Sequence, residues 1–242
     1  MSKPAIRTAD VSTSNSSRTF IPCLAPLLSI FFLILVGALA IPRGGAQDRY
    51  QDHDHDRDHD RDHDRDRDGF IRVSRDQFDR DFGGGRGGRP SPDAQCELGS
   101  VAVGFHVQTG EYFNQAWLDC APVRPEGWLG DEHRMTNRTG SPGGRPVWDA
   151  FCPNGFALRG LRGRTGASID EAAGVCSPLR EIAERRDDPR TAITQPITRP
   201  RPGGHPAGTE CPRGAVVTGF RSMSGEYMDH LWILCSELHR EH

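Results

Sequence analysis

The sequence lacks the motifs that mark most enzymes and most nucleic-acid-binding proteins. It contains no nucleophile elbow, phosphate-binding loop, HExxH motif or paired-carboxylate motif. Its net charge is only −3 over 242 residues, whereas nucleic-acid-binding domains are usually strongly basic. Aromatic residues make up only 7% of the chain, while Gly and Pro are abundant. We therefore expect neither an enzyme nor a nucleic-acid partner nor a dedicated cofactor, and the composition favours a turn-rich β protein.

The chain also lacks the short C-x2-C spacing that zinc sites use. Of its seven cysteines, Cys23 lies in an apolar N-terminal run, and the other six form three pairs with 24 positions between partners. An even set at regular spacing behind an export signal indicates disulfides, although six cysteines allow fifteen connectivities. Pairing within each unit is the most economical choice. The predicted disulfide cysteines are Cys96, Cys120, Cys152, Cys176, Cys211 and Cys235.

Charge is absent from residues 21–41, and basic residues precede this run. The pattern predicts an apolar helix within a signal peptide or signal anchor over residues 1–46, with the remainder exported. The protein is then secreted, periplasmic or on the cell surface. Cleavage and retention both remain open, and a retained anchor would attach the protein to a membrane through residues 21–41.

Apolar residues are scarce in the next segment, residues 47–95. Residues 47–68 are an Asp/His/Arg run, and residues 83–95 are a Gly-rich linker, so we predict a disordered spacer over 47–95. The histidines offer a weak divalent-metal site among the aspartates, and the alternative is a solvated spacer. The candidate metal ligands are His53, His55, His59 and His63.

What the chain does contain is one pattern repeated three times, at residues 96–120, 152–176 and 211–235. Glycines recur at three fixed offsets in each unit, and a Gly-Gly-x-Pro element precedes each unit. Within a unit, alternating apolar residues, a Gly turn and a second apolar run predict a β-hairpin. Since a lone hairpin cannot bury its apolar face, the three units are expected to pack around a pseudo-threefold axis in one all-β domain, residues 96–238.

Two tryptophans and the segments between the units complete the pattern. Trp117 and Trp232 occupy matching positions near the second cysteine, and we expect both to pack in the core. The intervening segments 121–151 and 177–210 must supply any further strands. The second of these is proline-rich, with a short helical pattern at Leu179–Arg185.

The third unit, Gly203–Leu238, resembles the closing segment of jacalin-related lectins. It has the same order of an apolar strand with Gly-Phe, a Gly-x-x-x-Asp turn and a last apolar strand. A second family, the vitelline membrane outer layer proteins, is similar in its cysteine-bracketed units and in the early Gly104-Phe105 and Gly219-Phe220 pairs. Both resemblances imply a β-prism of three Greek-key sheets.

The lectin resemblance implies that the Gly-x-x-x-Asp/Asn turns bind glycans. A tight turn exposes backbone N–H donors, a carboxylate accepts hydroxyl hydrogen bonds, and an aromatic ring covers the apolar face of a sugar. The turn at 225–229 has all three features, the turn at 166–170 lacks the aromatic ring, and the turn at 110–114 has Asn in place of Asp. The candidate carbohydrate-binding residues are Gly225, Glu226, Tyr227, Met228, Asp229, Gly166, Asp170, Gly110 and Asn114.

The same turns also fit a purely structural role. Glycine suits a turn residue with positive φ, and Asp or Asn beside a turn often bonds its own backbone. The alternative to a lectin is therefore a non-catalytic structural or envelope-interaction protein. Consecutive Asp131-Glu132-His133 brings acid and imidazole together in sequence, but neighbours along a strand do not face each other.

Overall fold

The computed structural model describes residues 70–199 and 203–241. The predicted leader, its apolar helix and the four candidate metal-ligating histidines lie outside these residues. Within the described ranges, no helix is long and apolar enough to cross a membrane. No group of three or more His, Cys, Asp or Glu side chains in these ranges is arranged to hold a metal ion.

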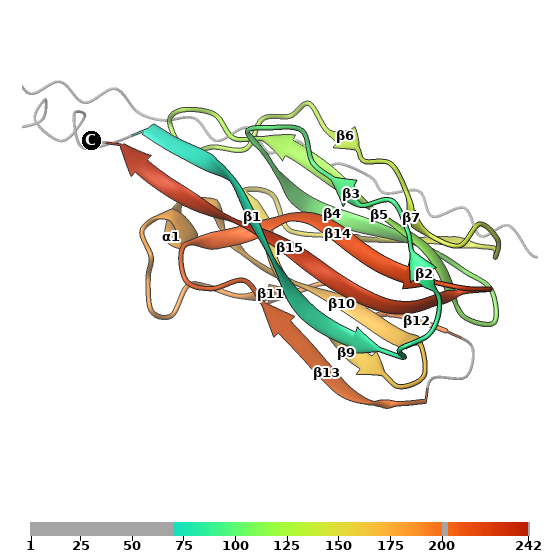
Figure 1. The fold of residues 1–242 in the computed structure, drawn as a ribbon. Coiled ribbons are helices and arrows are strands. Elements are labelled where there is room, and N and C mark those ends of the chain that lie inside the picture. The colour runs from blue at the N-terminus through green and yellow to red at the C-terminus, as the bar shows by residue number, and fades with distance from the viewer. Residues whose placement is uncertain (1–69, 200–202, 242) are drawn as a thin grey trace, which may run out of the picture. The chain divides into compact units, whose positions relative to one another are not determined.

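Three long hairpins form the framework of an all-β domain, as the repeats predicted (Figure 1). Their strands are β4 (Ser100–Thr109) with β5 (Phe113–Pro122), β9 (Phe156–Thr165) with β10 (Ile169–Pro178), and β14 (Ala215–Ser224) with β15 (Met228–Glu241). Each pair is antiparallel and has a register shift near the middle glycine, for example between Val217 and Gly219. The hairpins therefore carry the same irregularity, and all their strands have 10 residues except β15, which has 14.

Each hairpin is the centre of a separate Greek-key sheet. In the first sheet, β6 (Arg134–Met135) and β7 (Thr139–Gly140) pair with β5, and β8 (Val147–Phe151) pairs with β4. In the second, β11 (Ala192–Ile193) and β12 (Ile197–Thr198) pair with β10, and β13 (His205–Glu210) pairs with β9. The order third-second-first-fourth strand is that of a Greek key. Three such sheets around one core make a β-prism.

The third sheet is completed from the N-terminal side of the domain, which corrects the predicted spacer. β1 (Phe70–Gly84) pairs with β15 from Phe70↔Glu241 to Gly84↔His230, while β2 (Arg89–Pro90) and β3 (Ala94–Gln95) pair with β14. Residues 70–95 are thus part of the fold, and the domain begins well before residue 96. β1 is ordered because it covers the outer edge of β15 and buries Ile71 and Phe82.

The inward faces of the three sheets share one hydrophobic core. Phe105 from the first sheet and Phe220 from the third meet edge to face with ring centroids 6.0 Å apart. Trp117 is buried as predicted, whereas Trp232 is only partly buried and lies against His230. The core explains why the first strands of the first and third units are so apolar, since most residues of β4 and β14 are buried. β9 is less apolar, and its buried residues include Leu158 and Leu161.

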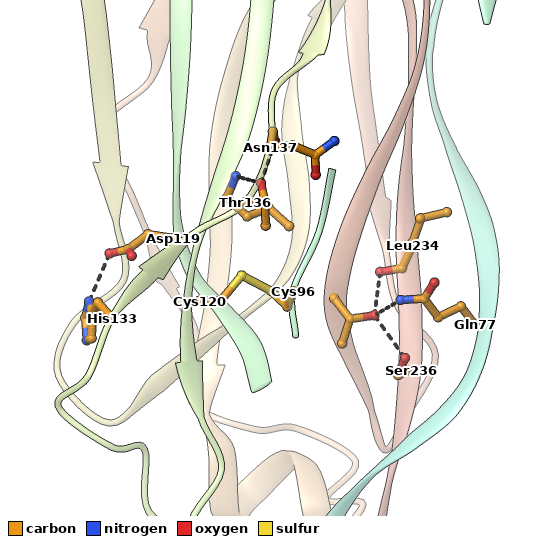
Figure 2. Close-up of a disulfide and its surroundings, with 11 residues drawn as sticks. Gln77, Cys96, Asp119, Cys120, His133, Thr136, Asn137, Leu234 and Ser236 are labelled. Carbon is orange, nitrogen blue, oxygen red and sulfur yellow. Dashed lines mark hydrogen bonds and ion pairs between the residues drawn. A yellow bond between two sulfur atoms is a disulfide. The ribbon is translucent and has the colours of Figure 1, made fainter. Parts of the chain in front are cut away.

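The six cysteines pair within their units, which is the economical connectivity. Cys96–Cys120, Cys152–Cys176 and Cys211–Cys235 each have Cα atoms 5.7 Å apart, within the usual range for a disulfide. Figure 2 shows the first bridge between the segment before β4 and the end of β5. Every disulfide therefore closes its hairpin at the end away from the turn.

The proline-rich segment 177–210 forms only short elements, as its sequence indicated. The predicted helix is present as the single turn α1 (Leu179–Ala183), whose Leu179 and Ile182 are buried. Its Glu181 carboxylate accepts hydrogen bonds from the backbone N–H and the Nε of Arg190, 2.7 and 2.6 Å away. These bonds lower the pKa of Glu181 below its ordinary value of 4.5. The ionised carboxylate thereby holds the loop after α1 in place.

Candidate functional site

The three Gly-x-x-x-Asp/Asn turns lie at the end of the prism opposite the disulfides (right in Figure 1). In every unit the turn glycine donates its backbone N–H to the carbonyl two residues on. The three bonds are Gly110 N to Tyr112 O at 2.8 Å, Gly166 N to Ser168 O at 2.9 Å, and Gly225 N to Tyr227 O at 3.0 Å. The predicted turns are therefore real and closely similar in geometry.

None of the turn glycines serves an unusual backbone angle, and two of them lie in close packing contacts. None of the three has a positive φ, unlike the glycine that faces each of them. A Cβ on Gly110 would lie 3.3 Å from the Gly144 Cα, and one on Gly166 would lie 3.2 Å from the Gly204 Cα. At Gly110 and Gly166 a second loop of the same sheet therefore lies close against the turn, whereas a Cβ on Gly225 would be 3.8 Å from the Gly88 Cα, an ordinary contact. This geometry replaces the expectation that these glycines serve a positive φ.

That second loop is the Gly-Gly-x-Pro element, which sequence reasoning treated only as a repeat boundary. Its second glycine is left-handed in all three sheets, with φ of 76° at Gly88, 81° at Gly144 and 63° at Gly204. A Cβ on Gly88 would lie 2.5 Å from Asp229 Oδ2 and 2.5 Å from the Ser224 carbonyl carbon. Only glycine fits there. The signal that could have revealed this loop was its threefold recurrence shortly before the first cysteine of each unit.

Each sheet thus builds one cradle, which we define as the turn, the Gly-Gly loop and the polar side chain between them. The first cradle contains Gly110, Asn114, Gly143 and Gly144; the second contains Gly166, Asp170, Gly203 and Gly204; the third contains Gly225, Asp229, Gly87 and Gly88. The polar oxygen faces the left-handed glycine in all three: Asn114 Oδ1 lies 2.6 Å, Asp170 Oδ2 2.5 Å and Asp229 Oδ2 2.5 Å from where its Cβ would stand.

The three cradles differ in what surrounds the polar group. Asp229 and Asn114 are partly exposed. Asp170 is only 2% exposed and forms an ion pair with Arg199, which is itself largely buried. No ion pair of Asp229 occurs in the part of the chain that the structure describes. The third cradle therefore presents an available carboxylate, the first a neutral amide, and the second a carboxylate already neutralised.

Two tyrosines join the first and third cradles. The rings of Tyr112 and Tyr227 stack with centroids 4.3 Å apart and planes 22° from parallel. The Arg199 guanidinium lies 5.1 Å from the Tyr112 ring centroid, within the range of a cation–π contact. The side chains of Asp170, Arg199, Tyr112 and Tyr227 thus connect all three turns at this end of the prism.

Two of the predicted site residues have positions that limit their roles. Glu226 is exposed on the third turn. Met228 is fully buried, as are Phe113 and Ile169 at the equivalent positions of the other units. The side chain at this position belongs to the core, so Met228 does not form part of the exposed site.

The consecutive Asp131-Glu132-His133 does not act as a unit. Instead, His133 Nδ1 lies 2.9 Å from Oδ2 of the buried Asp119, and the two side chains point toward each other and away from the disulfide (Figure 2). Glu132 pairs with Arg124. A groove of about 480 Å³ adjoins Asp119 and His133. Among the described residues its lining includes no serine, threonine or free thiol that could serve as a nucleophile.

Comparison with known proteins gives matches among solved structures only. No protein-family model matches the chain, and no curated protein matches it. Artocarpin, solved with methyl-α-mannose, is 12% identical with a TM-score of 0.46, and the match covers 67% of this chain and 99% of that one. Malaysian banana lectin is 14% identical with a TM-score of 0.44, covering 67% and 99%.

A mannose-binding jacalin-related lectin from Ananas comosus is 13% identical with a TM-score of 0.44, covering 66% of this chain and 98% of that one. The solved structures that resemble the chain thus include several lectins, one of which is described as jacalin-related. The likeness is one of fold, and the β-prism itself is defined by the sheet order and register described above.

Proposed function

We propose that the protein is an exported carbohydrate-binding protein and that the third cradle is its principal sugar site. The observation that carries this proposal is the partly exposed Asp229 carboxylate held between the Gly225 turn and the Gly87-Gly88 loop. Glycine loops let backbone N–H groups approach a sugar hydroxyl, and an ionised carboxylate accepts strong hydrogen bonds from two hydroxyls. Tyr227 adds an aromatic surface beside these polar groups.

The other two cradles are weaker candidates for different reasons. Asn114 retains the geometry of the first cradle but offers a neutral acceptor, so its hydrogen bonds to hydroxyls should be weaker. Asp170 is buried against Arg199, so a sugar would have to displace a charge partner to reach it. We therefore rank the sites as Asp229, then Asn114, then Asp170.

Export accounts for the three disulfides, which persist in oxidising compartments. On this proposal the protein is secreted, periplasmic or on the cell surface, and its partners are glycans or glycoconjugates. Residues 21–41 would attach it to a membrane if the leader is retained.

A structural or envelope-interaction role is the second candidate, and one observation favours it. The Asp170–Arg199 ion pair and the Tyr112–Tyr227 stack hold the turns together. The end of the prism that carries the three turns, which we call the apex, would also need such contacts in a purely structural role. The two candidates differ in what a change at Asp229 should do. A sugar site loses binding without losing stability, whereas a structural turn loses stability.

The test is a screen of the full chain, with its disulfides formed and in a non-glycosidic detergent, on an array of neutral and acidic glycans. We expect the parent to bind and Asp229→Asn to lose at least about tenfold in affinity, because removal of a charged hydrogen bond costs roughly 1.5–3 kcal/mol. The melting temperature should remain unchanged.

Asp170→Asn is the matched control. It should destabilise the domain, since it leaves Arg199 buried without its charge partner, but it should preserve the pattern of glycans bound. A well-folded parent that binds no glycan on the array would disprove the lectin proposal and favour the structural role.

A further inference from the structure

The first and third cradles are closer neighbours than three separate sites on a prism need to be. Ser141, just before the Gly143-Gly144 loop of the first cradle, donates its backbone N–H to the Asn114 carbonyl, 2.9 Å away. Its hydroxyl donates to the carbonyl of Gly225 in the third cradle. One residue therefore bonds the turns of both cradles.

Further contacts fix these two cradles relative to each other. The Thr139 and Ser222 hydroxyls are 2.8 Å apart in the buried interface between the first and third sheets. A Cβ on Gly140 would lie 3.0 Å from Met228 Cε, so β7, which leads into the loop of the first cradle, packs directly on the third hairpin. The Tyr112–Tyr227 stack closes the same junction at the surface. The spacing of the two cradles is thus set by packing rather than by mobile loops.

The second cradle is joined to this pair but differs from it in chemistry. Arg199 neutralises Asp170 and places its guanidinium against Tyr112. The partly exposed polar groups, Asn114 and Asp229, belong to the two cradles that the tyrosine stack joins. The apex therefore has two available cradles on one side and a closed one beside them.

From this arrangement, and resting on the proposed function, we infer that the first and third cradles form one extended site for a single oligosaccharide chain. One sugar residue occupies the Asp229 cradle, the chain passes the Tyr112–Tyr227 stack, and a later residue occupies the Asn114 cradle. The ligand class is then a glycan chain of several residues rather than a monosaccharide. The Asn114 cradle offers only a neutral amide, but it still contributes to binding. The sugar residue held in the Asp229 cradle keeps the rest of the glycan chain close to Asn114.

The energetic reason is effective concentration. Once the Asp229 cradle holds one end of the chain, the second contact is intramolecular, and fixed, adjacent sites make such linkage worth about 10²-fold or more in affinity. Two independent sites would instead show only a statistical gain as the chain lengthens. Chain length therefore separates the two arrangements.

The experiment measures calorimetric affinity and stoichiometry of the full chain with gluco-, manno- and galacto-oligosaccharides of one to five residues. We expect one pentasaccharide per protein and a rise of about 10²-fold over the monosaccharide in the series that binds. Asn114→Ala should remove most of this rise, so that the ratio of pentasaccharide to monosaccharide affinity falls toward the statistical value. Asp229→Ala should abolish binding at every length.

A second variant guards against misfolding at the first cradle. Tyr112→Ala removes one ring of the stack that joins the two cradles and leaves both polar groups, and it too should reduce the gain in affinity with chain length. Two pentasaccharides per protein, or a gain of no more than about fivefold that Asn114→Ala leaves intact, would overturn the inference and still support a lectin. Failure of all three series to bind would overturn the proposed function and this inference together.

Discussion

At the scale of single residues, glycine serves two different purposes in this fold. Gly99 and Gly88 are both left-handed, with φ of 81° and 76°. A Cβ on Gly99 would meet nothing within 4 Å, whereas one on Gly88 would overlap the Asp229 carboxylate and the Ser224 backbone. Gly99 therefore provides only a backbone angle, and Gly88 also provides the space in which the cradle forms.

This difference predicts that Gly88→Ala and Gly99→Ala will separate stability from binding. Both place an L side chain in the left-handed region, which costs roughly 1–3 kcal/mol. Gly88→Ala should cost more because of the overlap, and it should abolish glycan binding by moving Asp229. Gly99→Ala should bind normally while folded. Urea unfolding and glycan binding, measured on both variants, provide the check; normal binding by Gly88→Ala would exclude the Gly-Gly loop from the site.

At the scale of elements, β1 is the strand that sequence patterns identified least well. Its apolar residues are widely spaced among charges, and its partner β15 lies at the other end of the domain's sequence. The pairing is therefore non-local, and no turn or cysteine near residues 70–84 signals it. The hairpins were predictable because their strands, turn and disulfide all lie within one short repeat.

Two phenylalanines of β1 test whether it belongs to the folded domain. Phe82 is 3% exposed and Phe70 is 57% exposed. Phe82→Ala should destabilise the domain by about 3–5 kcal/mol, because it leaves a cavity in the shared core. Phe70→Ala should change the free energy of unfolding by no more than about 0.5 kcal/mol. Chemical denaturation of the two variants gives the comparison, and an equally small effect at both positions would show that β1 is not integral to the fold.

The candidate site was also predictable only in part. The repeat predicts the turns at 110–114, 166–170 and 225–229. The sequence pattern of the Gly-Gly-x-Pro loops that face them indicates only a linker or a repeat boundary. The Asp170–Arg199 ion pair could not be foreseen, because Arg199 is one of 30 Lys and Arg residues and comes from a proline-rich segment without a strand pattern. Sequence repeats thus reveal what the units share, whereas the charge partner of Asp170 comes from a segment outside the repeated units.

At the scale of the whole molecule, the disulfides lie at one end of the β-prism and the proposed glycan-binding cradles lie at the other. Each disulfide joins cysteines 24 positions apart and closes a hairpin at the end away from its turn. The cradles occupy the other end, where glycine contacts, the tyrosine stack and Ser141 hold the loops. Stability supplied by the disulfides and geometry supplied at the apex should therefore be separable.

Removal of the disulfides one at a time tests this separation. Because the three loops have equal length, the loop-entropy model assigns each a similar contribution of about 3–4 kcal/mol. The double variants Cys96→Ala/Cys120→Ala, Cys152→Ala/Cys176→Ala and Cys211→Ala/Cys235→Ala should lose stability by similar amounts, measured by urea unfolding. Below the unfolding transition each should retain the parent's glycan affinity, because the cradles depend on contacts at the opposite end. Loss of binding by a folded double variant would instead show that the two ends are coupled through the shared core.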